Sequence, residues 1–443
     1  MLQDKSSEAR SGDIWRLAWP IILANLTVPL VGLVDTAIMG HLPDPAFIGG
    51  VAIGGLIFSY VYWGFGFLRM STTGLAAQAS GAGDDNELRA TLARALGLAV
   101  IAGIICVALG GMIAGLALAI MDGDAVVEGH AETYFTIRVL AAPAALANTA
   151  ILGWFFGIRA MRAGMLQQLT VNLANVIFDV IFVFGFDMSI AGVAWASVVA
   201  QYLGLALSVV MLRHYLRRLG GAFQLPLIID RRKIIAMTRI NADIFIRTLC
   251  LLTGTALFMN ISAAQGTVIL AANAALLNLQ TLAAYGLDGF AHAAEVLVGR
   301  AIGAKAPQQL RQAVHRSSMM AAVLALLIGL IFYLFGAWII TLLTDIDAVR
   351  ETAMRFLPWA ALAPVISFAA FQLDGIFIGA TRSAEMRNAM LVSLGFFWLV
   401  LQVSVPLAAN HGLWFALVLF LGARSLALLW YYGRVREMAD PSA

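Results

Sequence analysis

Long apolar stretches recur along this chain, and short polar breaks separate them. The hydrocarbon core of a bilayer is about 30 Å thick, and a helix needs roughly 20 apolar residues to cross it. Only 12% of the 443 residues are charged, against roughly 25% in an ordinary soluble domain. The mean hydropathy of +0.88 agrees with this composition. The sequence therefore predicts an all-α polytopic membrane protein.

The polar breaks predict about twelve transmembrane helices. The first apolar run extends from Ile14 to about Met39, which is too long for a signal peptide, so we expect a retained first helix. The breaks fall near residues 40–46, 81–90, 122–130, 158–163, 187–190, 213–235, 262–267, 301–311, 344–350, 381–387 and 409–412.

Basic residues gather at every second break, and acidic or neutral residues occupy the breaks between them. By the positive-inside rule, this alternation predicts that both termini are cytoplasmic, and an even number of helices agrees. Arg138, Arg350 and Arg355, near the acidic side, are the exceptions. The net charge of +3 follows topology and does not indicate nucleic-acid binding.

The two halves of the chain repeat one another weakly, with a constant offset of 222 residues. The segment Gln78–Arg89 reads QASGAGDDNELR, and Arg300–Arg311 reads RAIGAKAPQQLR. The same offset relates GWFFG at Gly153–Gly157 to GIFIG at Gly375–Gly379. An offset kept over this length indicates an internal duplication.

Six helices in each half return the chain to its starting side, so the halves have the same orientation. We expect an N-terminal six-helix lobe over 1–212, a basic cytoplasmic linker over 213–234 and a C-terminal six-helix lobe over 235–443. Transporters built from such repeats bind their substrates near the midplane, at the interface of the repeats, which here is a central cleft.

Charged side chains inside the apolar stretches are the candidate site residues, because each costs roughly 2.5–3.5 kcal/mol to insert. Asp35 lies late in the first helix, and Asp179 lies in the middle of the fifth. Asn175, four residues before Asp179, shares its helix face. Such a cluster of oxygens can hold a sodium ion, or one carboxylate can carry a proton. The structural alternative is that both acids only bond to neighbouring helices.

A second polar group lies on the eighth helix. Asp288, His292 and Glu295 share one face, and they can form a proton relay. Equally, they can form a salt-bridged structural cluster with Arg247 or Arg300. A single local histidine does not make a zinc site.

Four further residues are candidates from their places in the helices. Asp374 on the tenth helix either contacts substrate or is a polar cap facing the cleft, and Asn148 is a further candidate in the cleft. Pro20 removes a backbone hydrogen bond from the first helix, so it is a candidate hinge or a static kink. Arg424, like Arg247, is expected to neutralise an acid.

Signatures of other protein classes are missing from the sequence. It contains no Walker A motif, and neither GxSxG nor HExxH, so we expect neither ATP-driven transport nor an enzyme. We expect no cofactor apart from a transported cation.

Several segments together resemble the MATE family of multidrug and toxic-compound extrusion transporters, and within it the DinF-like branch. They are LAWPIILANLTVPLVGLVDTAIMGHL, AAQASGAGD, NVIFDVIFVFGFDMSIAGVAWAS, AAYGLDGFAHAAEVLVGRAIGA and FQLDGIFIGATRS. The resemblance covers essentially the whole chain. It implies two six-helix lobes facing a V-shaped cleft, and antiport of an inward cation against an expelled drug-like molecule.

The family's cation site corresponds here to Asp35, Asn175 and Asp179, with a hydroxyl on the sixth helix that is Ser197 instead of the usual Thr. Pro20 matches the family's bending point. The seventh helix carries Asn260 where other branches have an acid, which favours coupling through the N-terminal lobe. The DinF-like resemblance favours the proton over sodium as the coupling ion.

The expected partners are the bilayer and small lipophilic organic cations, for a monomer in a bacterial inner membrane. Two alternatives within transport are an exporter of organic anions such as citrate, which suits the intramembrane arginines, and a lipid-intermediate flippase. The intramembrane acids argue against the flippase. A membrane-embedded enzyme or scaffold would need a catalytic constellation, which the sequence does not show.

Overall fold

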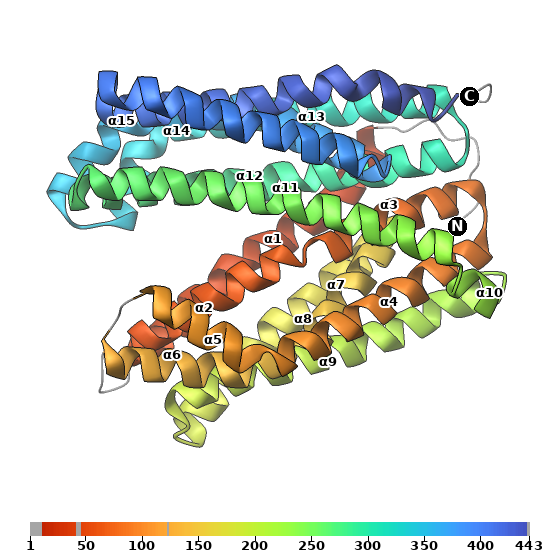
Figure 1. Ribbon diagram of the computed structural model, residues 1–443, viewed down its shortest axis with the longest axis horizontal. Helices are drawn as coiled ribbons and strands as arrows, with labels where there is room; N and C mark the ends of the chain where they lie inside the picture. Colours follow the sequence, from red (N-terminus) through yellow and green to blue (C-terminus); the bar gives the residue numbers. More distant parts are fainter. Residues whose placement is uncertain (1–10, 41–45, 122–123, 441–443) are drawn as a thin grey trace. The chain divides into compact units, whose positions relative to one another are not determined.

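The computed structural model describes residues 11–40, 46–121 and 124–440, and these are helical almost throughout, with no strand among them (Figure 1). The prediction of an all-α protein is therefore confirmed. The basic residues Lys5 and Arg10 and the acidic residues Asp44 and Asp122, which contributed to the charge alternation, lie outside the described residues.

The chain forms two compact units. The N-terminal unit is Leu23–Met237, and the C-terminal unit is Thr238–Ala443 together with Met1–Ile22. The predicted linker packs onto the N-terminal unit, where the Arg89 guanidinium donates hydrogen bonds to the carbonyl oxygens of Leu216, Leu219 and Gly220. The lobe boundaries at 212 and 235 stay a prediction.

Helices of the N-terminal unit are short and often interrupted. α1 (Ser11–Gly40) enters this unit from the C-terminal one. The others are α2 (Ala46–Gly64), α3 (Phe67–Ala82), α4 (Asp85–Ala108), α5 (Gly110–Met121), α6 (Ala125–Arg138), η1 (Val139–Ala141), α7 (Ala142–Gly157), α8 (Met161–Val180), η2 (Ile181–Gly185), α9 (Ser189–Arg218) and α10 (Leu225–Ile228).

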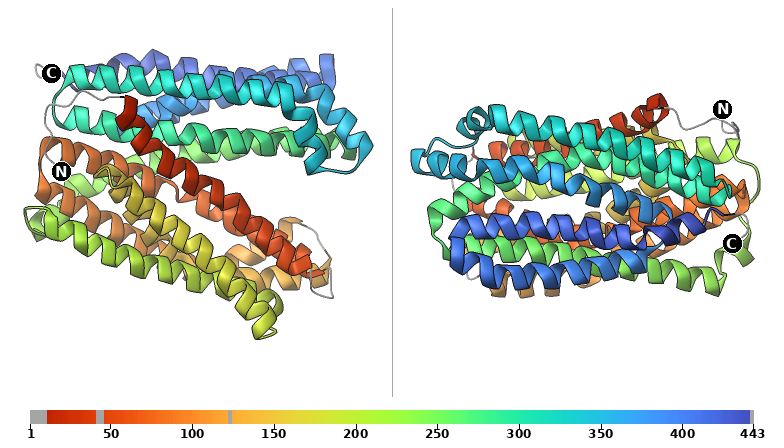
Figure 2. Two further views of the ribbon diagram at one scale, coloured as in Figure 1. Left: turned by 180° about the vertical axis from the view of Figure 1, so that it is seen from behind. Right: turned by 90° about the horizontal axis from the view of Figure 1, so that it is seen from above.

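Helices of the C-terminal unit are longer, and they lie side by side in both views (Figure 1 and Figure 2). α14 packs against α12, α13 and α15. The bounds are α11 (Arg231–Ala264), α12 (Thr267–Gly303), α13 (Pro307–Leu343), α14 (Asp347–Gly379) and α15 (Ser383–Glu437).

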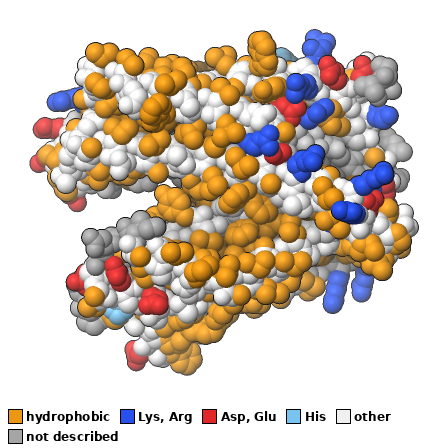
Figure 3. Space-filling model, in the orientation of Figure 1, with side chains coloured by type: hydrophobic (Ala, Val, Ile, Leu, Met, Phe, Trp, Pro, Cys, Tyr) orange, Lys and Arg blue, Asp and Glu red, His pale blue; other side chains and the backbone are white. Residues whose placement is uncertain are grey.

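Ten helical segments of the described chain are long and apolar enough to cross a membrane. One of them, α15, is broken by non-helical backbone at Ala408 and Ala409, so it accounts for two crossings. With α1, the structure is consistent with the predicted twelve helices. Large apolar side chains such as Leu407 and Trp430 are 80% and 86% exposed, and orange side chains cover much of the face in Figure 3, as expected for surfaces that contact lipid.

Helix packing confirms the internal repeat. A Cβ atom at Gly153 would lie 2.4 Å from the carbonyl oxygen of Arg69, and one at Gly375 would lie 2.1 Å from that of Ala291. Gly375 and Ala291 lie 222 positions after Gly153 and Arg69, respectively. Close packing of α7 on α3 is therefore reproduced by α14 on α12, because glycine lets the two backbones approach.

The turns after these helices repeat as well. Arg159 and Thr381, related by the same offset, have φ angles of 64° and 55°. Gly83 and Lys305 are related by the same offset, and they have φ angles of 71° and 49°. This left-handed conformation is uncommon for residues other than glycine, so its recurrence at matched positions shows that the two halves fold in the same way.

We predict that Gly375→Ala lowers the thermal stability of the purified protein in detergent. The new methyl group would overlap the backbone of Ala291, and overpacking of this kind costs about 1–3 kcal/mol. Gly395→Ala is the matched control, because this glycine is exposed on α15 and no atom lies within 4 Å of the position that its new Cβ would occupy. Equal melting temperatures for the two variants would contradict the packing argument.

Candidate functional site

Four predicted site residues of the N-terminal unit come together in the structure. Asp35 is on α1, Asn175 and Asp179 are in the last turns of α8, and Ser197 is on α9. Their exposed fractions are 6%, 5%, 0% and 7%. The side-chain amide of Asn175 donates to the Ser197 hydroxyl at 3.3 Å, so this pair links α8 to α9 beside the acids.

The two carboxyl groups of this site face each other. Asp35 and Asp179 lie within hydrogen-bonding range of one another. Asp35 Oδ1 and both carboxylate oxygens of Asp179 are buried and receive no hydrogen bond from the described part of the protein. An uncompensated buried charge is costly, so this pair needs a proton or a cation to neutralise it.

The helix changes form directly after Asp179. α8 ends at Val180, and the five residues Ile181–Gly185 form a π-helical turn. Single π-helical turns are rare and often lie at functional sites. The wider turn shifts the helix register after Asp179, and no feature of the sequence had predicted it.

A cavity of about 390 Å³ opens beside the acid pair, within the N-terminal unit. Three of the four predicted residues, Asp35, Asn175 and Ser197, line it. Its other polar or aromatic lining comes from residues that the sequence did not single out as a site: Phe58, Ser59, Tyr134, Arg138, Asn172 and Gln201.

Arg138 is the important addition to the site. Its guanidinium donates a hydrogen bond to the Tyr134 hydroxyl and lies 4.2 Å from the centroid of the Phe58 ring. It also acts electrostatically on both Asp35 and Asp179. The sequence showed Arg138 only as an exception to the charge alternation, and that exception was the signal for a charge placed inside the protein.

Asn148, which stays a prediction as a cleft residue, forms hydrogen bonds between helices of the N-terminal unit. Its amide donates to the carbonyl oxygen of Gln201 at 2.9 Å, and its own backbone oxygen accepts from Gln167 at 2.8 Å. The Ser208 hydroxyl donates to its side-chain oxygen at 3.2 Å. These bonds tie α7 to α8 and α9, and Asn148 does not line the cavity of the acid pair.

Asp374 of the C-terminal unit is buried between two arginines. Its Oδ2 accepts hydrogen bonds from Arg247 on α11 and from Arg424 on α15, the latter at 2.9 Å. The exposed fractions of the three residues are 7%, 8% and 3%. The expectation that both arginines neutralise an acid agrees with this arrangement, and the acid is Asp374.

The other two acids of this unit that were predicted as site residues, Asp288 and Glu295, lie on α12. His292 Nδ1 lies 3.2 Å from a carboxylate oxygen of Glu295, which is fully buried. Asp288 acts electrostatically on Arg424. His292 and Glu295 therefore meet on one helix face, as predicted from their spacing, and Arg247 pairs with Asp374.

Pro20 lies inside α1 and is buried. The division between the two compact units falls two residues later, between Ile22 and Leu23. On the side of the C-terminal unit, Trp15 lies 6.0 Å from Phe290, measured between ring centroids. Asp35, on the same helix, belongs to the N-terminal unit.

Comparisons with known proteins agree with these features. The sequence profile of the MatE family matches residues 20–181 and 244–404. "DNA damage-inducible protein F" of Escherichia coli K12 is 40% identical over 419 residues, which cover 94% of this chain and 91% of that protein. "Probable multidrug resistance protein NorM" of Bacillus cereus is 24% identical, with 93% of each chain covered.

A solved structure described as the outward-facing conformation of a multidrug resistance MATE family transporter superposes with a TM-score of 0.89. It covers 99% of this chain at 18% identity, and 98% of its own length is matched. This likeness supports the fold. The family profile and the Escherichia coli relative support membership of the family. The chain belongs to the MatE family, the transporters of multidrug and toxic-compound extrusion.

Proposed function

We propose that this protein is a cation-coupled antiporter that exports drug-like organic compounds by alternating access. In this proposal the coupling ion binds at Asp35 and Asp179, and the adjoining cavity of the N-terminal unit takes part in substrate binding. The protein acts as a monomeric transporter without a resident cofactor. It lies in a bacterial inner membrane with both termini in the cytoplasm.

The observation that carries this proposal is the unsatisfied acid pair. Three buried carboxylate oxygens receive no hydrogen bond from the residues that the structure describes, and they lie beside a cavity of about 390 Å³. A purely structural pair would be expected to have donors, because buried polar groups normally do. A site that must bind and release a cation cannot have its oxygens occupied permanently.

The arrangement favours the proton over sodium as the coupling ion. Two facing carboxyl groups can share a proton with no further ligand, whereas a sodium ion needs several oxygens around it. Asn175 and Ser197 already bond to each other at 3.3 Å. Sodium binding would require the Asn175 side-chain oxygen and the Ser197 hydroxyl to join the carboxylates as ligands.

Arg138 favours a second candidate function, the export of organic anions. Its guanidinium lines the same cavity as Asp35. Once the acids are neutralised by protons, the formal charge left in that cavity is positive. A carboxylate-bearing substrate would then be attracted and a cationic one repelled. The two candidates make opposite predictions for a variant that lacks this charge.

Transport from proteoliposomes tests the proposed function. We expect ethidium export under an imposed pH gradient and not under a sodium gradient. Export driven by sodium alone would leave the antiporter proposal standing and change its ion. Failure under both gradients, with citrate exported instead, would favour the anion exporter.

We predict that Asp179→Asn reduces gradient-driven export to the level of vesicles without protein, while folding is retained. An amide cannot release a proton in this pH range, so the pair would lose one of its two exchangeable acids and could no longer share a proton between carboxyl groups. Asp187→Asn is the matched control: it makes the same chemical change in the same unit, at an exposed position with a φ angle of 53°, which asparagine tolerates. Wild-type export by Asp179→Asn would remove this site from the mechanism.

We predict that Arg138→Gln lowers the apparent KM for ethidium about fivefold, because a repulsion of about 1 kcal/mol between the substrate and the guanidinium is lost. Arg138→Lys, which keeps the charge, should behave like the wild type. The measurement is the dependence of the initial export rate on dye concentration. An unchanged KM together with loss of citrate export would support the anion exporter.

A further inference from the structure

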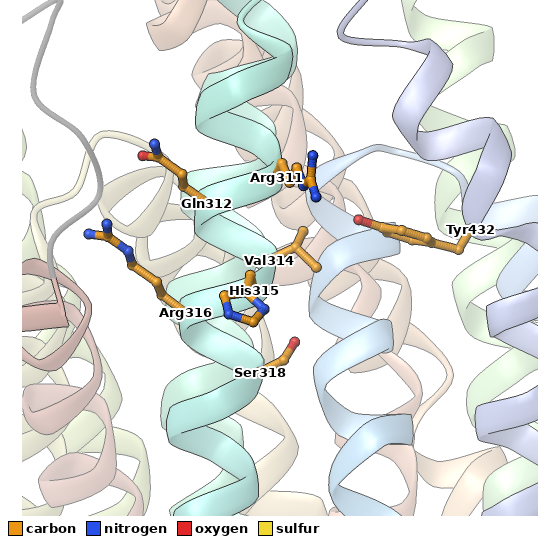
Figure 4. Close-up of a pocket in the computed structure, with 7 residues that line it drawn as sticks. All are labelled: Arg311, Gln312, Val314, His315, Arg316, Ser318 and Tyr432. Atoms are coloured by element: carbon orange, nitrogen blue, oxygen red, sulfur yellow. The ribbon is translucent and has the colours of Figure 1, made fainter.

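The first turns of α13 and the last turns of α15 form a basic pocket. This pocket belongs to the C-terminal unit and is separate from the acid pair. Its volume is about 570 Å³, and Arg311, His315 and Arg316 of α13 and Tyr432 of α15 are among its lining residues. Figure 4 shows Arg311 directed toward Tyr432, with His315 one turn further along α13. This size suits a small-molecule group, for which pockets of about 300–1,000 Å³ are usual.

The charge of this pocket is positive. None of its lining residues in the described chain is acidic. A neighbouring cavity of about 700 Å³ shares Arg311 and Tyr432 and adds Arg436, together with the acidic residues Glu437 and Asp440. Of the two cavities, the acids line the second one, and the pocket proper has hydrogen-bond donors suited to a phosphate.

An apolar stripe of α13 continues from the pocket. Arg311 and His315 are exposed on one helix face, and the same face carries on at helical spacing along the helix. Its next members are Met319, Val323, Leu326 and Leu330, which are 51%, 53%, 58% and 53% exposed. The stripe from Met319 to Leu330 is about 17 Å long, close to half of a hydrocarbon core of about 30 Å.

Tyr432 of α15 lines the other side of the pocket. Trp430 is 86% exposed and Leu426 is 70% exposed, and the half-buried Tyr432 follows within the same helix. Tryptophan and tyrosine are enriched at the boundary between the hydrocarbon and the headgroups. The pocket therefore lies at headgroup depth, with the apolar stripe below it in the hydrocarbon.

We propose that this pocket binds an anionic phospholipid. The phosphate lies between Arg311 and His315 with the Tyr432 hydroxyl as a further donor, and an acyl chain lies along the stripe from Met319 to Leu330. Basic pockets between transmembrane helices are known to hold acidic headgroups. A free phosphate or nucleotide would use the arginines and leave the apolar stripe without a role.

Lipid binding to the purified full-length protein tests this proposal. The protein is placed in nanodiscs of phosphatidylcholine alone, or of equal parts of phosphatidylcholine and phosphatidylglycerol, and retained lipid is counted by native mass spectrometry. The test variant is Arg311→Gln/Arg316→Gln. The control is Arg213→Gln/Arg217→Gln, which removes the same charge from exposed positions on α9.

We expect the wild type to retain phosphatidylglycerol in preference to phosphatidylcholine. The test variant should bind phosphatidylglycerol roughly twentyfold to thirtyfold more weakly, since each basic residue contributes about a fivefold effect near a membrane surface, and the control should match the wild type. Met319→Ser/Val323→Ser should weaken binding of the lipid while leaving any binding of inorganic phosphate unchanged.

Three results would overturn the proposal: no lipid preference in the wild type, equal weakening by the test and control pairs, or displacement of the lipid by millimolar inorganic phosphate. Thermal unfolding in phosphatidylcholine checks that every variant is folded. The readout is lipid binding and not transport, so its failure would leave the antiporter proposal unaffected.

Discussion

The structure depends on one constraint: a charge inside a hydrocarbon layer must be neutralised within the protein. Most buried acids meet this constraint by permanent pairing. Asp374 lies between two arginines, Glu295 lies beside a histidine, and Asp243 accepts hydrogen bonds from an arginine and a serine. Asp35 and Asp179 receive no such donor from the described chain. This exception is the reason for our proposal that a transported cation neutralises this pair.

The duplication explains the scaffold but not the site. Matched glycines and matched left-handed turns show that the backbone requirements were kept in both halves. The offset of 222 that relates them places Leu257 and Leu401 where the first half has Asp35 and Asp179. Leu401 belongs to a buried apolar cluster against which Leu257 packs. The two halves share a fold, and one of them fills the corresponding region with a hydrophobic core.

Sequence reasoning predicted the helices and the repeat because hydropathy and backbone geometry are local properties. It also predicted Asp35 and Asp179, since an acid within an apolar run is visible without a structure. It could not predict which acid Arg247 and Arg424 neutralise, because these residues lie 127 and 50 positions from Asp374. Arg138 was missed as a site residue for a related reason: the sequence does not show whether a charged side chain on a helix faces a cavity of the protein or its surface.

Two helices, α1 and α11, cross the division between the compact units. Of these, α1 carries Asp35, and it contains a proline two residues before the division, whereas α11 contains none. A proline lacks the N–H that would complete the helical hydrogen bond, so bending at Pro20 costs less than at positions of α1 that keep this bond. Neutralising Asp35 would change the forces on one end of a helix whose other end packs with the C-terminal unit. The hinge at Pro20 stays a prediction, and the connectivity of α1 supplies the mechanical reason for it.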